Sequence, residues 1–164
     1  RQRTINIPGI EMAVSAVDSY FENNLGKRVV IIGGGLVGCE TGIFLAGRGH
    51  EVTIVEIQDV VAPEAIGLYR TALIREIHAR GIKVLTESKC IEIGTTGIEV
   101  DGPRGRQLIP ADSVVCSLGM VSEEWHELRG AAGEIPVVPV GDCASVGKVG
   151  GAISSAYRAA MSII

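Results

Sequence analysis

The residues best placed to do chemistry are Gly33-Gly34-Gly35-Leu36-Val37-Gly38, followed eighteen residues later by Glu56. Glycines in this spacing let a backbone approach a phosphate closely, and a helix that begins there adds free N–H groups and a positive dipole end. An acidic residue about twenty positions further on can accept hydrogen bonds from a ribose. The spacing therefore predicts a dinucleotide site, with the diphosphate on the glycines and the adenosine ribose on Glu56.

Such a site needs a strand, a turn, a helix and a second strand to position it. The sequence predicts a strand over 28–32, a helix over 36–48 and a strand over 51–56. Gly33 would permit the tight turn out of the first strand, while Gly38 and Gly42 would let the helix pack closely. A glycine turn that binds nothing is the alternative, and the flanking strand and helix patterns argue against it.

The charge near Glu56 predicts which coenzyme the site prefers. A 2′-phosphate would be repelled by Glu56 and would need a nearby base to neutralise it. Residues 57–62 contain no Lys or Arg, and the next base is Arg70. We therefore expect NADH rather than NADPH.

The remaining pattern predicts an α/β fold with three layers. Strand and helix patterns alternate as far as residue 85, short period-two segments then indicate an antiparallel meander, and a buried strand follows. An irregular connection that contains Trp125, an apolar strand and a small-residue helix packed on a sheet complete the chain. The expected elements are an extended segment 4–9, helices 11–24, 65–80 and 150–164, strands 82–85, 112–119 and 135–140, meander segments 90–93, 97–100 and 107–109, and a connection 120–134.

Composition excludes several classes of function. The 164 residues carry a net charge of −4 and only 4% aromatic residues, so no basic, aromatic surface for nucleic acid is expected. No apolar run approaches the roughly 20 residues that span a membrane. The first residues do not form a secretion signal, because Pro8 and Gly9 interrupt them. These features predict a cytoplasmic protein that binds neither nucleic acid nor membrane.

The four cysteines are scattered singly and predict no metal or redox centre. Cys39, Cys90, Cys116 and Cys143 form no CxxC pair and have no ligand spacing with any histidine. We expect free, buried thiols. Cys39 lies in the first turns of the predicted glycine-motif helix, where the dipole lowers a thiol pKa, but packing is the favoured role.

Three stretches in order, GKRVVIIGGGLVGCETGIFLAGRGHEVTIVE (26–56), ADSVVCSLGM (111–120) and VPVGDC (138–143), resemble the flavoprotein pyridine nucleotide-disulfide oxidoreductase superfamily. In character the chain is most similar to NADH-dependent flavin oxidoreductases of the 2-enoate reductase and 2,4-dienoyl-CoA reductase group. The resemblance implies an NAD(H) domain inserted in an FAD domain. Residues 1–26 would then lead in from the FAD domain, 27–119 would bind NADH, and 120–164 would return to the FAD domain.

The same resemblance implies roles for three further residues. Glu40 would border the nicotinamide, Gly119 would lie where the backbone crosses close to the cofactor, and Asp142 would hold the ribityl chain of FAD. A favourable acid in the first turns of a helix is the alternative for Glu40, and a carboxylate capping its own turn is the alternative for Asp142. The candidate cofactor-binding residues are Gly33, Gly34, Gly35, Leu36, Val37, Gly38, Glu40, Glu56, Gly119 and Asp142.

For the intact protein, the resemblance implies transfer of hydride from NADH to FAD and then to an enoate or enoyl thioester. It also implies a preceding β/α barrel with FMN and an iron–sulfur cluster. Residues 1–26 depart from the family pattern because they lack the glycine motif that opens its FAD domain. We therefore expect an excised part of a longer enzyme that binds NADH without turnover and FAD poorly.

Other interpretations stay open at this point. The chain could be a stand-alone NAD(H)-binding, redox-sensing module, although half a flavin site would then serve no purpose. The glycine motif could also bind FAD itself, because flavin sites use the same turn and acid. The partners expected are NADH and the rest of its own polypeptide. A face left exposed by a missing FAD half could also drive formation of a homo-oligomer.

Overall fold

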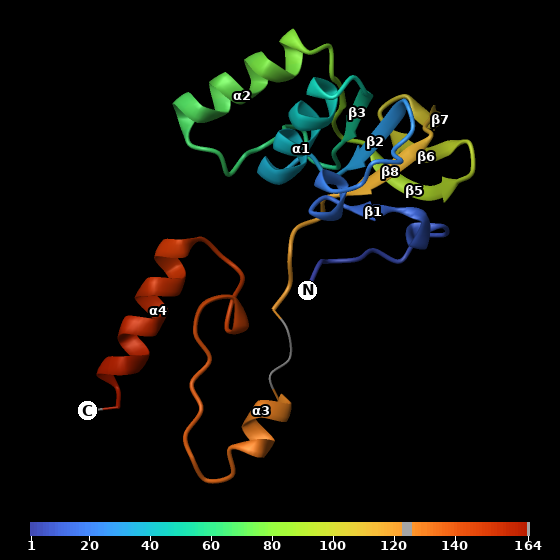
Figure 1. The fold of residues 1–164 in the computed structure, drawn as a ribbon. Helices are drawn as coiled ribbons and strands as arrows, with labels where there is room; N and C mark the ends of the chain where they lie inside the picture. Colours follow the sequence, from blue (N-terminus) through green and yellow to red (C-terminus); the bar gives the residue numbers. More distant parts are fainter. Residues whose placement is uncertain (123–125, 164) are drawn as a thin grey trace. The chain divides into compact units, whose positions relative to one another are not determined.

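The computed structural model describes residues 1–122 and 126–163, with the side chains of residues 126–128 left aside. The chain divides into two compact units (Figure 1). The larger unit comprises residues 4–119, and the smaller comprises residues 1–3 together with the residues from 120 onward. Each unit has its own elements and is described by itself.

The larger unit is built on a parallel sheet with the strand order β1-β8-β2-β3-β4. Every pair in it is parallel, so the carboxyl ends of the strands lie at one edge. The predicted strands 28–32, 51–56, 82–85 and 112–119 are confirmed with small changes at their ends. The observed strands are β1 (Val14–Ser15), β2 (Arg28–Ile32), β3 (Glu51–Val55), β4 (Lys83–Leu85) and β8 (Ser113–Cys116).

Three layers result, as predicted. Helices α1 (Leu36–Gly47) and α2 (Gly67–Ala79) lie on one side of the sheet, and an antiparallel meander lies on the other (Figure 1). The pleat of β2 explains this arrangement, because Val29 and Ile31 pack with the helices while Val30 and Ile32 pack with the meander. The meander consists of β5 (Lys89–Gly94), β6 (Gly97–Gly102) and β7 (Gly105–Pro110).

The helix predicted over 11–24 is wrong. This stretch holds two short 3₁₀ turns, η1 (Ile10–Met12) and η2 (Asp18–Tyr20), with β1 between them. The Ser15 hydroxyl accepts the backbone N–H of Asp18 and donates to the Asp18 carboxylate, contacts that compete with a helix. Pairing of β1 with β8 then adds a fifth strand to the parallel sheet.

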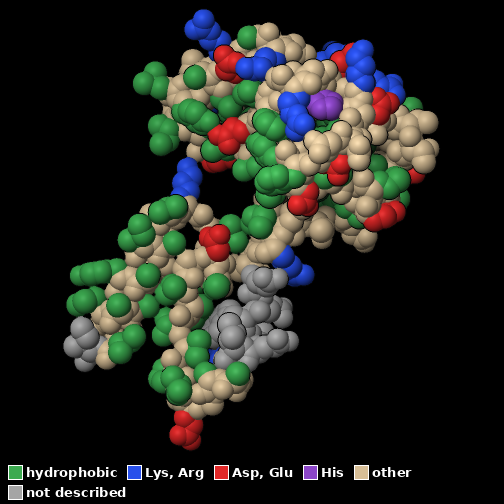
Figure 2. Space-filling view, in the orientation of Figure 1, with side chains coloured by type: hydrophobic (Ala, Val, Ile, Leu, Met, Phe, Trp, Pro, Cys, Tyr) green, Lys and Arg blue, Asp and Glu red, His purple; other side chains and the backbone are tan. Residues whose placement is uncertain are grey.

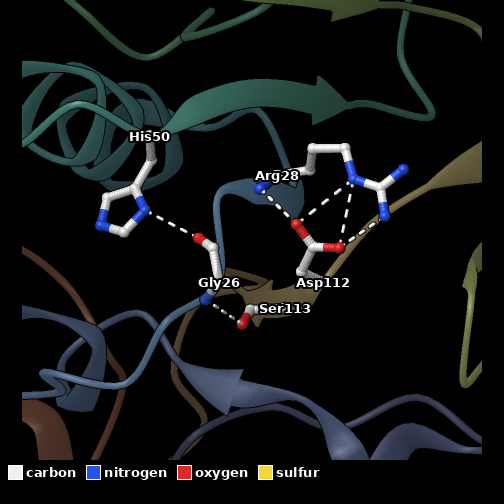
Figure 3. Close-up of polar contacts among 5 residues, drawn as sticks. All are labelled: Gly26, Arg28, His50, Asp112 and Ser113. Carbon is white, nitrogen blue, oxygen red and sulfur yellow. Dashed lines mark hydrogen bonds and ion pairs between the residues drawn. The ribbon is translucent and has the colours of Figure 1, made fainter.

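Polar contacts join the start of β2 to the start of β8 (Figure 3). Arg28 precedes the glycine motif, and its backbone N–H and guanidinium both donate to the Asp112 carboxylate. The backbone N–H of Gly26 donates to Ser113 Oγ, and the His50 ring donates from Nδ1 to the Gly26 carbonyl at 2.8 Å. The amino ends of β2 and β8 are therefore fixed side by side.

The smaller unit contains α3 (His126–Ala131), η3 (Gly141–Cys143) and α4 (Val149–Met161). The strand predicted over 135–140 is wrong: these residues form no strand. Pro136 and Pro139 cannot donate ladder hydrogen bonds, and within the described residues this stretch has no partner strand. Of the predicted connection 120–134, residues 123–125, including Trp125, lie outside the described residues.

The final helix is confirmed, but its predicted burial against a sheet is not. Its residues at a spacing of four form an apolar stripe whose members are 55–76% exposed. Figure 2 shows hydrophobic side chains along this helix. Apart from the Gln2–Met120 bridge, the described part of this unit has no sheet against which the stripe could pack. The stripe consists of Val149, Ile153, Tyr157 and Met161.

Candidate functional site

The glycine turn lies at the carboxyl end of β2, as its spacing predicts. Gly33 has a φ of +103°, which favours glycine, and a Cβ there would lie 2.3 Å from the carbonyl oxygen of Ser117. Its backbone N–H donates to the Val55 carbonyl at 2.9 Å. The first glycine is thus required both by its conformation and by the close passage of the segment that follows β8.

The third motif glycine allows α1 to pack closely on the turn. A Cβ on Gly38 would lie 2.0 Å from the carbonyl oxygen of Gly33, a separation that backbone atoms cannot accept without movement. One turn further along, a Cβ on Gly42 would be 3.2 Å from Ile54 Cδ1 on β3. The small-residue face predicted for this helix is therefore present.

Glu56 lies directly beside the glycine turn. Its Oε2 accepts the backbone N–H of Gly34 at 2.6 Å, and its Oε1 accepts that of Gln58 at 2.8 Å. The residue is only 9% exposed. A carboxylate has about four acceptor positions, so two are left beyond these backbone contacts. The structure thus brings the predicted acid and the predicted cradle together.

The start of α1 is the part of the site that faces a phosphate in such folds. Gly35 occupies the N-cap position and offers no side-chain cap. Instead, the backbone N–H of Leu36 donates to Glu64 Oε1 at 2.5 Å. A side chain from the loop after β3 therefore already supplies an anion to this helix terminus.

Glu40, one turn into α1, is also engaged by a residue that sequence reasoning did not single out. The Tyr69 hydroxyl on α2 donates to Glu40 Oε1, and this hydrogen bond raises the pKa of Tyr69. Neither Glu64 nor Tyr69 lies in a recognisable motif. Their only sequence signal is that they follow β3 and Glu56 along the chain.

A pocket of about 370 Å³ adjoins Glu56 at the carboxyl edge of the sheet. Its walls are mostly apolar, with the Glu56 side chain and the polar residues Ser88 and Lys89 at its border. Both strands of the nucleotide unit contribute their last residues to it. The lining residues are Ile5, Asn6, Ile7, Ile32, Gly33, Val55, Glu56, Ile57, Ser88, Lys89, Cys90 and Leu118.

The cysteines agree with a packing role, with one exception. Cys39 is fully buried, and burial, together with the charges of Glu64, Glu56 and Glu40, raises its pKa to about 12. The helix dipole does not make this thiol reactive. Cys90 and Cys116 are also buried, whereas Cys143 is exposed, so the prediction of burial is wrong for Cys143 alone.

The remaining predicted site residues, Gly119 and Asp142, belong to different units. Gly119 follows β8 with a φ of +83°. Asp142 belongs to the smaller unit, where its Oδ1 accepts the backbone N–H of Gly147 at 3.1 Å. Asp142 therefore caps its own turn, the role that the alternative interpretation gave it, and one carboxylate oxygen remains.

No metal centre or membrane span occurs in the described part of the chain. Among these residues, no group of three or more His, Cys, Asp or Glu side chains could hold a metal ion. None of the helices formed by residues 1–122 and 126–163 is both long and apolar enough to cross a membrane.

Comparison with known proteins gives one family. Residues 1–133 match the profile of the family described as pyridine nucleotide-disulphide oxidoreductase. A cinnamate reductase of Clostridium sporogenes is 36% identical over 98% of this chain and 25% of its own length. An NADH oxidase of Thermoanaerobacter brockii is 36% identical over 84% of this chain and 21% of its own length. The chain thus spans about a quarter of the curated relatives it matches.

A solved structure of a reductase also matches the fold of this chain. A 2-naphthoyl-CoA reductase in complex with 2-naphthoyl-CoA superposes with a TM-score of 0.85 at 27% identity. The match covers 96% of this chain and 25% of that protein. The three-layer fold is therefore one that this reductase also contains.

Proposed function

Because this chain belongs to the pyridine nucleotide-disulphide oxidoreductase family, we propose that its residues 27–119 are the NADH-binding domain of a flavin-dependent oxidoreductase. In the intact protein, hydride would pass from NADH to FAD and on to a reducible enoate or enoyl thioester. The names of relatives that reduce cinnamate and bind 2-naphthoyl-CoA support this class of acceptor. Bound cofactors would supply the hydride chemistry, while this chain binds and orients the coenzyme.

The observation that carries the proposal is the hydrogen bond between Glu56 and Gly34. The Glu56 carboxylate, the proposed ribose acceptor, lies 2.6 Å from the Gly34 backbone nitrogen of the proposed phosphate-binding turn, at the edge where parallel sheets bind ligands. A nearly buried carboxylate repels a 2′-phosphate strongly, because little water screens it. This favours NADH over NADPH.

The pocket beside Glu56 supports the same placement. An adenosine whose ribose contacts Glu56 would have its ring within reach of these mostly apolar walls. Small-molecule sites typically combine such apolar walls with a few polar groups. We propose that this pocket takes the adenine ring.

The flanking residues are proposed to belong to an FAD domain that other parts of the intact protein complete. In this proposal residues 1–26 and 120–164 are its lead-in and return segments, and Gly119 lies at the crossing between the domains. Asp142 would hold the ribityl chain through its remaining oxygen, and Glu40 would border the nicotinamide. An FMN and iron–sulfur barrel, if the protein has one, would lie outside this chain.

Calorimetric titration of the purified chain with NADH, NADPH and FAD tests the proposal. We expect NADH to bind at least about tenfold more tightly than NADPH, since each factor of ten is about 1.4 kcal/mol of charge discrimination. FAD should bind weakly, and the chain should not oxidise NADH. FAD binding that displaces NADH would instead make the glycine turn a flavin site.

A further inference from the structure

We propose that Glu64 is a built-in competitor for the diphosphate position, carried on a strap that dinucleotide must displace. The strap is residues 63–69, which end the loop after β3 and form the first turn of α2. This inference rests on the proposed function of the glycine turn. It adds a control of coenzyme affinity that lies within the nucleotide unit itself.

Glu64 contacts the start of α1. Its Oε1 lies 2.5 Å from the backbone nitrogen of Leu36, the donor that a diphosphate would use. A Cβ on Gly35 would lie 3.1 Å from the same oxygen. The absence of a side chain at Gly35 therefore leaves room for an anionic group, and the Glu64 carboxylate now uses that room.

The strap is anchored at both ends. Before it, Ala62 is fully buried and its backbone N–H donates to the Gly34 carbonyl at 2.8 Å. Ala62 has a φ of +47°, which turns the chain sharply at this point. At the other end, the Tyr69 hydroxyl donates to Glu40 on α1. The strap thus runs from the glycine turn to the second turn of α1.

The strap can open at a small cost in free energy. Between its anchors it buries little: Ile66 is 80% exposed and Leu68 is 90% exposed, and only Ala65 is partly buried against the core. Segments with few buried contacts open locally at free energies far below that of global unfolding. Displacing the strap would require loss of the Glu64 and Tyr69 contacts and of the packing of Ala65, while the buried Ala62 stays in place.

The consequence is competition between two anions for one donor. A diphosphate and the Glu64 carboxylate cannot both accept the same Leu36 N–H, and their charges repel. Apparent affinity is the intrinsic affinity reduced by the fraction of molecules in which the strap is open. From the strength of similar helix-terminal hydrogen bonds, we expect loss of the contact to tighten NADH binding by roughly three- to tenfold.

The experiment compares NADH affinity in four proteins by calorimetry: the parent chain, Glu64→Ala, Glu64→Asp and Glu92→Ala. Glu64→Ala removes both the charge and the acceptor oxygen, whereas Glu64→Asp keeps the charge but draws the carboxylate back from Leu36 by one methylene. Glu92 is exposed on β5 of the meander, so Glu92→Ala controls for the change in net charge. We expect both Glu64 variants to bind NADH more tightly and Glu92→Ala to match the parent.

The other outcomes separate the two proposals. If only Glu64→Ala gains affinity, the effect is general electrostatics and the competitor is refuted. If all four proteins bind NADH equally, the strap does not control the site, while the proposed function stands. If none binds NADH, the proposed function itself fails. Tyr69→Phe provides a second check, because release of the distal anchor should also tighten binding.

Discussion

Glu56 and Gly34 lie 22 residues apart in the sequence and are joined by a 2.6 Å hydrogen bond from the glycine N–H to the carboxylate. The same carboxylate accepts the backbone N–H of Gln58. Glu56 therefore holds the turn and the following loop together in addition to presenting an acceptor to a ligand. Changes at this residue should affect both binding and folding, and the two effects can be separated.

We expect Glu56→Gln to weaken NADH binding about tenfold or more. The variant should also show a smaller preference for NADH over NADPH. The amide keeps most of the shape of the side chain. It removes the negative charge that would bind the ribose hydroxyls and repel a 2′-phosphate. Calorimetry with both coenzymes measures the two affinities. Glu51→Gln, at the exposed amino end of β3, the strand that Glu56 directly follows, is the matched control and should bind both coenzymes as the parent does. Tighter binding of NADPH than NADH by the parent would contradict the charge argument.

Gly38→Ala should destabilise the larger unit by about 1–3 kcal/mol, the usual effect of overpacking a tight contact. The new methyl would meet the Gly33 carbonyl oxygen at 2.0 Å, so the helix must move from the turn. Urea unfolding followed by circular dichroism measures the loss. At Gly67, in contrast, an added Cβ would meet nothing within 4 Å. Gly67→Ala should leave stability unchanged or raise it, and equal losses in both variants would contradict the prediction.

The Arg28–Asp112 pair should make the free energy of unfolding depend on pH in the acid range. Hydrogen bonds from Arg28 lower the pKa of Asp112 to about 2, from an ordinary value of 3.8. A carboxyl whose folded pKa is depressed stabilises the fold above its unfolded pKa and loses that contribution as pH falls through the folded pKa. The contribution should therefore be complete above about pH 4 and disappear toward pH 2.

Urea midpoints measured between pH 6 and pH 2 test this expectation. Asp112→Asn should lower the midpoint at pH 6 and flatten its fall below pH 4. Asp101→Asn removes an exposed carboxylate of β6 and leaves the pair intact, so it should keep the steep fall of the parent. If the urea midpoint falls with pH in the same way for the parent and Asp112→Asn, the pair does not contribute to the pH dependence of stability.

Thiol alkylation should distinguish Cys143 from the other cysteines. Cys143 is exposed, whereas Cys39 is buried and its pKa is raised to about 12, so almost no thiolate exists there near neutral pH. Brief treatment with iodoacetamide at pH 8, followed by peptide mass spectrometry, should label Cys143 first. Cys39, Cys90 and Cys116 should react only after denaturation. Early labelling of Cys39 would indicate a reactive thiol at the glycine-motif helix.

Local sequence determined the elements that build the nucleotide unit. The run Val29–Ile32, the glycine spacing and the acid at Glu56 predict a strand, a turn, a helix and a second strand, and all four are present. Period-two segments likewise predict the meander. These features depend on contacts between near neighbours, which a local pattern records. The same reasoning failed for 11–24 and 135–140, where the outcome depends on whether a distant strand is available as a partner.

Only the tertiary structure decided what the side chains around the turn contact. Glu64 reaches Leu36 across 28 residues, and Arg28 reaches Asp112 across 84. No periodicity or spacing specifies such pairs, because they arise where separate segments meet, the first pair beyond the carboxyl end of β2 and the second at its amino end. The sequence alone therefore predicted a cradle for a diphosphate. The folded chain showed that one of its own carboxylates already occupies the donor at the start of α1, because the loop after β3 returns across that helix.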